Sequence, residues 1–159
     1  MVTRRTVMAG MAGLPIAGLA ANLLGTSIAY SQDAAMAETI ATSEGDLTIH
    51  PVDHASLVLQ WGDKVIYVDP VGGAALYEGL PTPTAILITH GHGDHFDVPT
   101  LEAIAGSVPL LTNEDVFGKL PEALKANATS IANGEDGELD GVKLKAIAAH
   151  NTTADRMNY

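Results

Sequence analysis

The residues best suited to chemistry lie in one short run of the 159-residue chain, residues 89–95, which read THGHGDH. Three of the chain's six histidines and one carboxylate fall within this run. Imidazole nitrogens with a carboxylate are the ligand set of zinc, and also of iron or manganese. Crowding four such groups together is unfavourable unless a metal ion or solvent satisfies them. The run therefore predicts a metal site made by His90, His92, Asp94 and His95.

The position of the run supports the same interpretation. An apolar segment, residues 85–89, is typical of a buried strand and leads directly into His90. Loops that follow buried strands carry functional groups on a rigid scaffold. Gly91 and Gly93 are expected to let the loop fold back tightly, so that alternate side chains converge on one point.

The elements that must hold this loop are short. We predict strands at 47–50, 56–61, 64–68, 85–89, 108–111, 129–132 and 142–149, helices at 99–105 and at 116–126, the second interrupted at Pro121, and an acidic turn at 133–137. The pair Gly62-Asp63 predicts a two-residue hairpin turn. Early hairpins followed by alternating strands and helices indicate a layered α+β or α/β domain.

Composition excludes several classes of function. Apolar residues make up 47% of the chain and charged residues 17%, which indicates a folded domain with a core. The net charge of −11, with only eight Lys and Arg, argues against a nucleic-acid partner. The absence of cysteine excludes disulfides, thiolate metal sites and cysteine nucleophiles, and it fits an oxidising compartment.

The N-terminal residues 1–37 resemble a twin-arginine export signal. Arg4 and Arg5 precede a moderately apolar, glycine-rich stretch, and no acidic residue occurs before Asp33. Small residues allow cleavage after Ala29 or Ala37, and we favour the second site; an uncleaved membrane anchor is the alternative. The expectation is a periplasmic protein, carried by the twin-arginine export machinery, with no stable membrane span after cleavage and a folded part at 38–159.

The histidine run resembles the signature of the metallo-β-lactamase superfamily. The pattern His90-x-His92-x-Asp94-His95 is the part of the sequence that carries this resemblance. It implies a four-layer αββα fold and two metal ions, expected to be zinc, with iron or manganese left open. The first two histidines are then expected to hold one ion, and the Asp and the third histidine the other.

The resemblance extends to residues outside the run. Asp69, which ends an earlier predicted strand, matches an acidic residue that braces the site by hydrogen bonding, and His150 matches a further ligand of the first ion. The resemblance implies hydrolysis of an ester, lactone, amide or phosphoester in a small-molecule substrate. Asp94 and Asp69 are the expected catalytic residues, with Asp94 orienting the nucleophile or moving its proton.

Two further histidines are interpreted differently. The segment His54-Ala55-Ser56 resembles the branch with lactonase-like and uncharacterised metal-dependent hydrolases. His54 is therefore expected beside the metal pocket, as a support or a substrate contact, although a strand-end histidine with a structural role remains the alternative. His50 is interpreted as structural.

The resemblance covers roughly residues 47–159, which corresponds to the first half of the family's fold. The later Asp that bridges the metals and the final His have no counterpart here. We therefore expect a fragment of a longer protein, with weak or single-metal binding and little activity by itself. The alternatives are a single-iron oxygen-using enzyme and a non-catalytic metal-binding half-domain.

Overall fold

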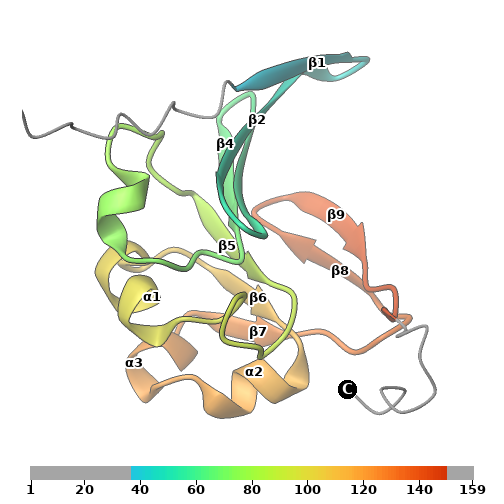
Figure 1. Ribbon diagram of the computed structural model, residues 1–159. Helices are drawn as coiled ribbons and strands as arrows, with labels where there is room; N and C mark the ends of the chain where they lie inside the picture. Colours follow the sequence, from blue (N-terminus) through green and yellow to red (C-terminus); the bar gives the residue numbers. More distant parts are fainter. Residues whose placement is uncertain (1–36, 150–159) are drawn as a thin grey trace, which may run out of the picture. The chain divides into compact units, whose positions relative to one another are not determined.

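The computed structural model describes residues 37–149 (Figure 1). The export signal predicted at 1–37, apart from its last residue, and the ligand predicted at His150 lie outside the described residues, so both stay predictions. Within 37–149, no helix is long and apolar enough to cross a membrane.

One seven-stranded mixed sheet forms the centre of the described part, with its strands in chain order. The first four strands are antiparallel, and β4 to β7 run parallel. The strands are β1 (Glu38–Thr42), β2 (Gly45–Asp53), β3 (Ser56–Trp61), β4 (Lys64–Val68), β5 (Ala85–Ile88), β6 (Leu110–Thr112) and β7 (Ala128–Ser130). This mixed sheet with few helices confirms the predicted fold class, as a partial metallo-β-lactamase-type fold.

The connections follow from strand direction. The hairpin turn between β3 and β4 is the predicted one, and Gly62 adopts the left-handed conformation there, with φ 62°. Parallel neighbours require crossovers, which contain η1 (Ala74–Tyr77), α1 (Val98–Ile104), α2 (Glu114–Lys119) and α3 (Glu122–Lys125). The interruption predicted at Pro121 within residues 116–126 is confirmed, because α2 ends before this residue and α3 begins after it, as its restricted backbone favours.

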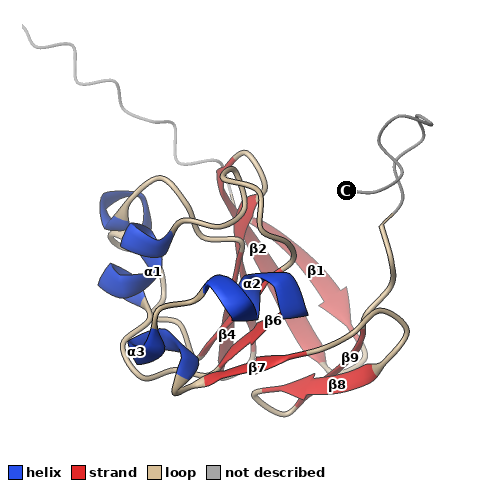
Figure 2. Ribbon diagram, turned by 90° about the horizontal axis from the view of Figure 1, so that it is seen from below, coloured by secondary structure: helices blue, strands red, loops and turns tan. Residues whose placement is uncertain are grey.

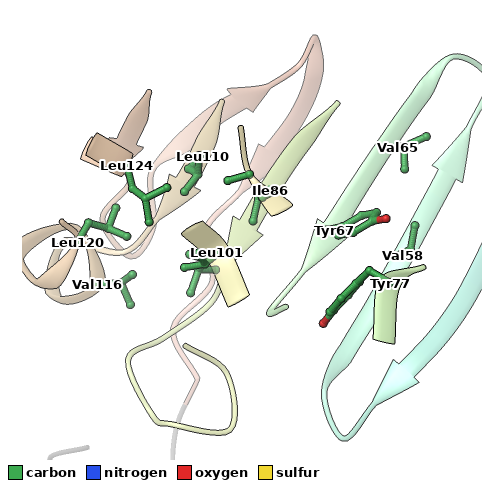
Figure 3. Packing of buried hydrophobic residues seen from close by; sticks show 12 residues of the cluster. Val58, Val65, Tyr67, Tyr77, Ile86, Leu101, Leu110, Val116, Leu120 and Leu124 are labelled. Carbon is green, nitrogen blue, oxygen red and sulfur yellow. The ribbon is translucent and has the colours of Figure 1, made fainter. Parts of the chain in front are cut away.

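The two faces of the parallel strands pack against different elements. Ile86 and Leu110 point to the face covered by the helices, where they join the main core (Figures 2 and 3). Ala85 and Leu111, one residue away on the same strands, point to the opposite face, because side chains alternate along a strand. Leu139 of a separate hairpin packs there.

That separate hairpin, β8 (Asp136–Leu139) and β9 (Val142–Lys145), corrects two predictions. Part of the predicted acidic turn at 133–137 is strand, and the strand predicted at 142–149 ends at Lys145. The cause is local pairing, since Asp136 and Lys145 are the outermost partners of the hairpin. Strand β1 was not predicted. All its residues are exposed, so its sequence lacks the alternation of apolar and polar residues that marks a half-buried strand.

Candidate metal centre

The histidine run begins directly after β5, at the end of a buried strand, as predicted. Two turn hydrogen bonds hold it, in which the His95 and Phe96 amides donate to the His92 carbonyl at 2.9 and 2.8 Å. The loop is thus fixed by its own backbone as well as by the strand before it.

The two glycines of the loop do not use the left-handed backbone that glycine alone adopts freely. Among residues 37–149, neither Gly91 nor Gly93 adopts a positive φ. A Cβ at Gly91 would instead lie 2.5 Å from Oδ2 of Asp115, which is paired with Lys119 of α2 at 2.7 Å. A Cβ at Gly93 would meet nothing within 4 Å. A side chain at position 91 would have to move the flexible ends of two α2 side chains, and the structure gives no reason for Gly93.

Three imidazoles converge in this loop. The His90 ring lies 4.7 Å from the His92 ring and 4.0 Å from the His95 ring, measured between centroids. His90 Nε2 and His92 Nδ1 are 3.1 Å apart. Two ligand nitrogens on one tetrahedral zinc ion lie about 3.3 Å apart, because each Zn–N bond is about 2.0–2.1 Å. The donor types and this separation therefore fit a shared metal ion.

Asp69 is the buried acceptor behind these histidines. Its carboxylate, 2% exposed as a residue, follows β4 and adopts a left-handed backbone with φ 45°. It accepts hydrogen bonds from the Thr89 amide at 2.7 Å, the Thr89 hydroxyl at 2.6 Å and His95 Nδ1 at 2.8 Å. Because a carboxylate only accepts, Nδ1 of His95 carries the proton, and its Nε2 is left as the donor atom for a metal.

The backbone of Asp69 is itself fastened to the hairpin before it. The buried Ser56 hydroxyl donates to the Asp69 carbonyl at 2.6 Å. The Val71 amide donates to the Tyr77 hydroxyl at 2.9 Å, and Tyr77 stacks on Tyr67 in the core (Figure 3). These contacts hold the uncommon backbone conformation of Asp69 in place.

Thr89 is a site residue that the sequence argument missed. Its hydroxyl donates to Asp69, and the same oxygen lies 3.0 Å from His90 Nδ1. Because the Thr89 hydroxyl already donates its proton to Asp69, its oxygen accepts a hydrogen bond from His90 Nδ1–H. The other nitrogen of this ring, Nε2, is then available for a metal. Asp69 thus orients His95 directly and His90 through Thr89. A hydroxyl residue directly before the histidine run was the available signal in the sequence.

We expect Thr89→Val to lower the affinity for zinc about tenfold, because the His90 ring loses the acceptor that fixes its orientation. Thr89→Ser keeps the hydroxyl and should retain the affinity. Calorimetric titration of both metal-free variants with Zn²⁺ measures the difference. Equal affinities in the wild type and Thr89→Val would show that the hydroxyl plays no part in orienting His90.

The charges of the site suit metal ligation. Burial, and then the neighbouring imidazoles of His95 and His92, lower the pKa of His90 below its usual range. A hydrogen bond from its own backbone, with further contributions from His95 and His54, lowers the pKa of Asp94. A lowered pKa keeps the imidazole neutral and the carboxylate ionised to more acidic pH, and these are the forms that bind metals.

His54 lies beside Asp94 and His95, at the edge of this histidine cluster. It occupies the turn between β2 and β3, and its Nε2 is 3.0 Å from Asp94 Oδ2. One donor atom from each of His54, Asp94 and His95 lies within 4.8 Å of the other two. His50 lies within β2 opposite Val58, and its Nε2 is buried without a hydrogen-bond partner in the described part. The structure therefore brings together all the predicted site residues of the described part, Asp69 and His54 included.

Comparisons with known sequences point in one direction. A family model described as the beta-lactamase superfamily domain matches residues 48–158. The hydroxyacylglutathione hydrolase of Glaesserella parasuis is 32% identical over 112 residues, 67% of this chain and 45% of that protein. The hydroxyacylglutathione hydrolase of Xanthomonas euvesicatoria is 29% identical over 91 residues, 57% of this chain and 33% of that protein. The chain spans less than half the length of these curated relatives.

Solved structures give the same picture. A protein described as a metal-dependent hydrolase from Parabacteroides distasonis aligns with a TM-score of 0.64 and 31% identity, covering 75% of this chain and 53% of the other. A metallo hydrolase from Ignicoccus hospitalis aligns with a TM-score of 0.54 over 69% of this chain and 52% of the other. At 14% identity, this second likeness concerns the fold alone.

Proposed function

The chain belongs to the metallo-β-lactamase superfamily, and from this membership we propose that it acts in the metal-dependent hydrolysis of a small-molecule substrate. The observation that carries the proposal is the convergence of three imidazoles in front of one buried carboxylate. Asp69 holds two of these rings so that an Nε2 atom of each is left for a metal. A purely structural histidine cluster has no need of this orientation.

The ligands are assigned by position. We propose that His90 and His92, with His150, hold one ion, and that Asp94 and His95 hold the second. Imidazole and carboxylate donors favour zinc, with iron or manganese as alternatives. A divalent ion held there would lower the pKa of a bound water toward neutrality and would polarise the bond under attack.

The chain's own residues supply the rest of the chemistry. Asp69 and Thr89 keep the ligand imidazoles in one orientation, so little rearrangement is needed when substrate binds. The exposed Asp94 carboxylate stays ionised and can accept a proton from the attacking water or orient it. Asp69, buried and already accepting three hydrogen bonds, acts through the groups that it positions.

The names of the curated relatives support one substrate class over the others. Both are named hydroxyacylglutathione hydrolases, so among esters, lactones, amides and phosphoesters we favour an acyl bond, and within that class a thioester. This choice rests on similarity over part of those proteins, and the site residues described above are equally suited to an ester or a lactone.

The test compares bond classes with and without metal. The full product of the reading frame is assayed with an acyl thioester of glutathione, an aryl ester and a phosphodiester. We expect hydrolysis of the thioester or ester, loss of activity after chelation, and recovery on adding Zn²⁺. Hydrolysis that continues at the same rate without metal would contradict the proposal. Oxygen consumption restored by iron would favour the single-iron oxygen-using enzyme instead.

A further inference from the structure

We infer that His54, in the turn between β2 and β3, is a third protein ligand of the metal ion held by Asp94 and His95. This inference rests on the proposed metal-dependent function. It adds a ligand from the N-terminal hairpin, some forty residues before the histidine run in the sequence. The site that it completes has two imidazoles and one carboxylate.

The distances support three ligands around one point. His54 Nε2 lies 3.0 Å from Asp94 Oδ2, and His95 Nε2 lies 3.7 Å from the same oxygen. These two separations lie on either side of the roughly 3.3 Å expected between neighbouring ligands of a tetrahedral zinc ion. One donor atom from each residue lies within 4.8 Å of the other two. Small rotations of the side chains therefore suffice to bring all three onto one ion.

The orientation of the rings is also suitable. His95 Nδ1–H donates a hydrogen bond to Asp69, so Nε2 of His95, the nitrogen that faces Asp94, is the unprotonated one that a metal requires. The rings of His54 and His95 meet edge to face, with an interplanar angle of 81° and centroids 5.9 Å apart.

The hairpin turn is built in a way that holds His54 in this place. His54 has a positive φ of 41°, an uncommon conformation for residues other than glycine, although His, Asn and Asp adopt it more often than most. Ser56, two residues later, donates its buried hydroxyl to the Asp69 carbonyl at 2.6 Å. The same residue that orients His95 is thus tied to the turn that carries His54. Backbone strain of this kind is common at functional sites.

A simple ion pair explains the contact less well. The side chains of His54 and Asp94 are 63% and 54% exposed, and an exposed pair contributes little to stability. Ligation of an ion would give the His54 imidazole a role that such an exposed ion pair does not.

The experiment isolates this site. In a His90→Ala, His92→Ala background, the residues His54, Asp94 and His95 remain, and we expect about one equivalent of Co²⁺ to bind with a visible ligand-field band. Adding His54→Asn removes the imidazole but suits the left-handed backbone. This change should weaken Co²⁺ binding at least about tenfold and change the band. Asp53→Asn, at the end of β2 directly before the turn, is the matched control and should bind as the background does.

A second measurement reads the ligand directly. In the otherwise wild-type chain, long-range ¹H–¹⁵N spectra of the histidine rings are recorded before and after adding Zn²⁺. We expect the His54 Nε2 resonance to move to the range of metal-bound nitrogen. If wild-type protein binds zinc while His54 Nε2 does not shift and His54→Asn leaves Co²⁺ binding unchanged, the inference is overturned and the proposed function stands. If the folded wild-type protein binds no metal, both fail.

Discussion

Replacing Asp69 with alanine is expected to destabilise the protein and to weaken zinc binding more than any other single change outside the ligands. The substitution removes one buried acceptor and leaves the Thr89 amide, the Thr89 hydroxyl and His95 Nδ1 without their partner. Hydrogen bonds to a charged group contribute about 1.5–3 kcal/mol each, and their losses overlap at one site, so we expect a loss of about 3 kcal/mol or more.

Metal affinity should fall together with stability. The His95 ring loses the contact that fixes its proton on Nδ1, and His90 loses the same support through Thr89. Removing one such supporting contact lowers metal affinity about 10–100-fold. Thermal unfolding of the metal-free protein and calorimetric titration with Zn²⁺ measure the two effects separately.

Two variants keep the Asp69 prediction testable. Asp69→Asn retains one acceptor oxygen in the same volume, so it should fold even if Asp69→Ala proves too unstable to fold. We expect the folded Asp69→Asn protein to bind zinc only weakly. Asp63→Asn removes an exposed carboxylate from the turn between β3 and β4, and should change stability by less than about 0.5 kcal/mol. Wild-type zinc affinity in a folded Asp69→Asn protein would contradict the positioning role of this residue.

Replacing His90 and His92 together with alanine is expected to abolish hydrolysis while leaving the metal-free fold intact. The two nitrogens that lie 3.1 Å apart are removed, and with them the first ion of the proposed pair. A catalytic metal contributes several kcal/mol of transition-state stabilisation, which corresponds to a loss of kcat/KM of about 10³-fold or more.

The fold of this double variant should persist because neither histidine contributes to the hydrophobic core. The midpoint of thermal unfolding, measured after chelation, should therefore stay close to that of the metal-free wild type. Retention of metal-dependent hydrolysis in the folded double variant would show that the reaction takes place elsewhere in the protein.

Much of the candidate site could be predicted because its residues are close together in the sequence. The run from His90 to His95 combines an unusual composition with a position at the end of an apolar strand, and both signals are local. Asp69 required the resemblance to a family, since its distance from the run says nothing about contact. Its buried, triple acceptor role is visible only in the structure.

The contacts that could not be predicted depend on tertiary approach. Thr89 matters because its hydroxyl lies between Asp69 and His90, and this needs the ends of two parallel strands to lie side by side. From the sequence, His54 could belong either to the site or to the structural framework, because tertiary approach decides this as well. Its turn approaches Asp94 through pairing of β2 with β3, not through neighbouring residues.

The errors in the fold have physical causes too. Strand β1 is exposed along its whole length, so no apolar alternation marks it. Strand β8 contains Gly137 and acidic residues, which indicated a turn, yet it pairs with β9 and buries Leu139. Gly91 was expected to provide backbone freedom, whereas the space that it leaves is taken by the side chains of Asp115 and Lys119.

The central claim is that this chain binds catalytic metal through the histidine run, and calorimetric titration of the folded, metal-free protein with Zn²⁺ tests it most directly. We predict a saturable binding signal of more than one equivalent in the wild type, and of about one equivalent, held by the remaining ligands, in the His90→Ala, His92→Ala variant. A folded wild-type protein that takes up no zinc, iron or manganese, or a double variant that binds zinc as the wild type does, would contradict it.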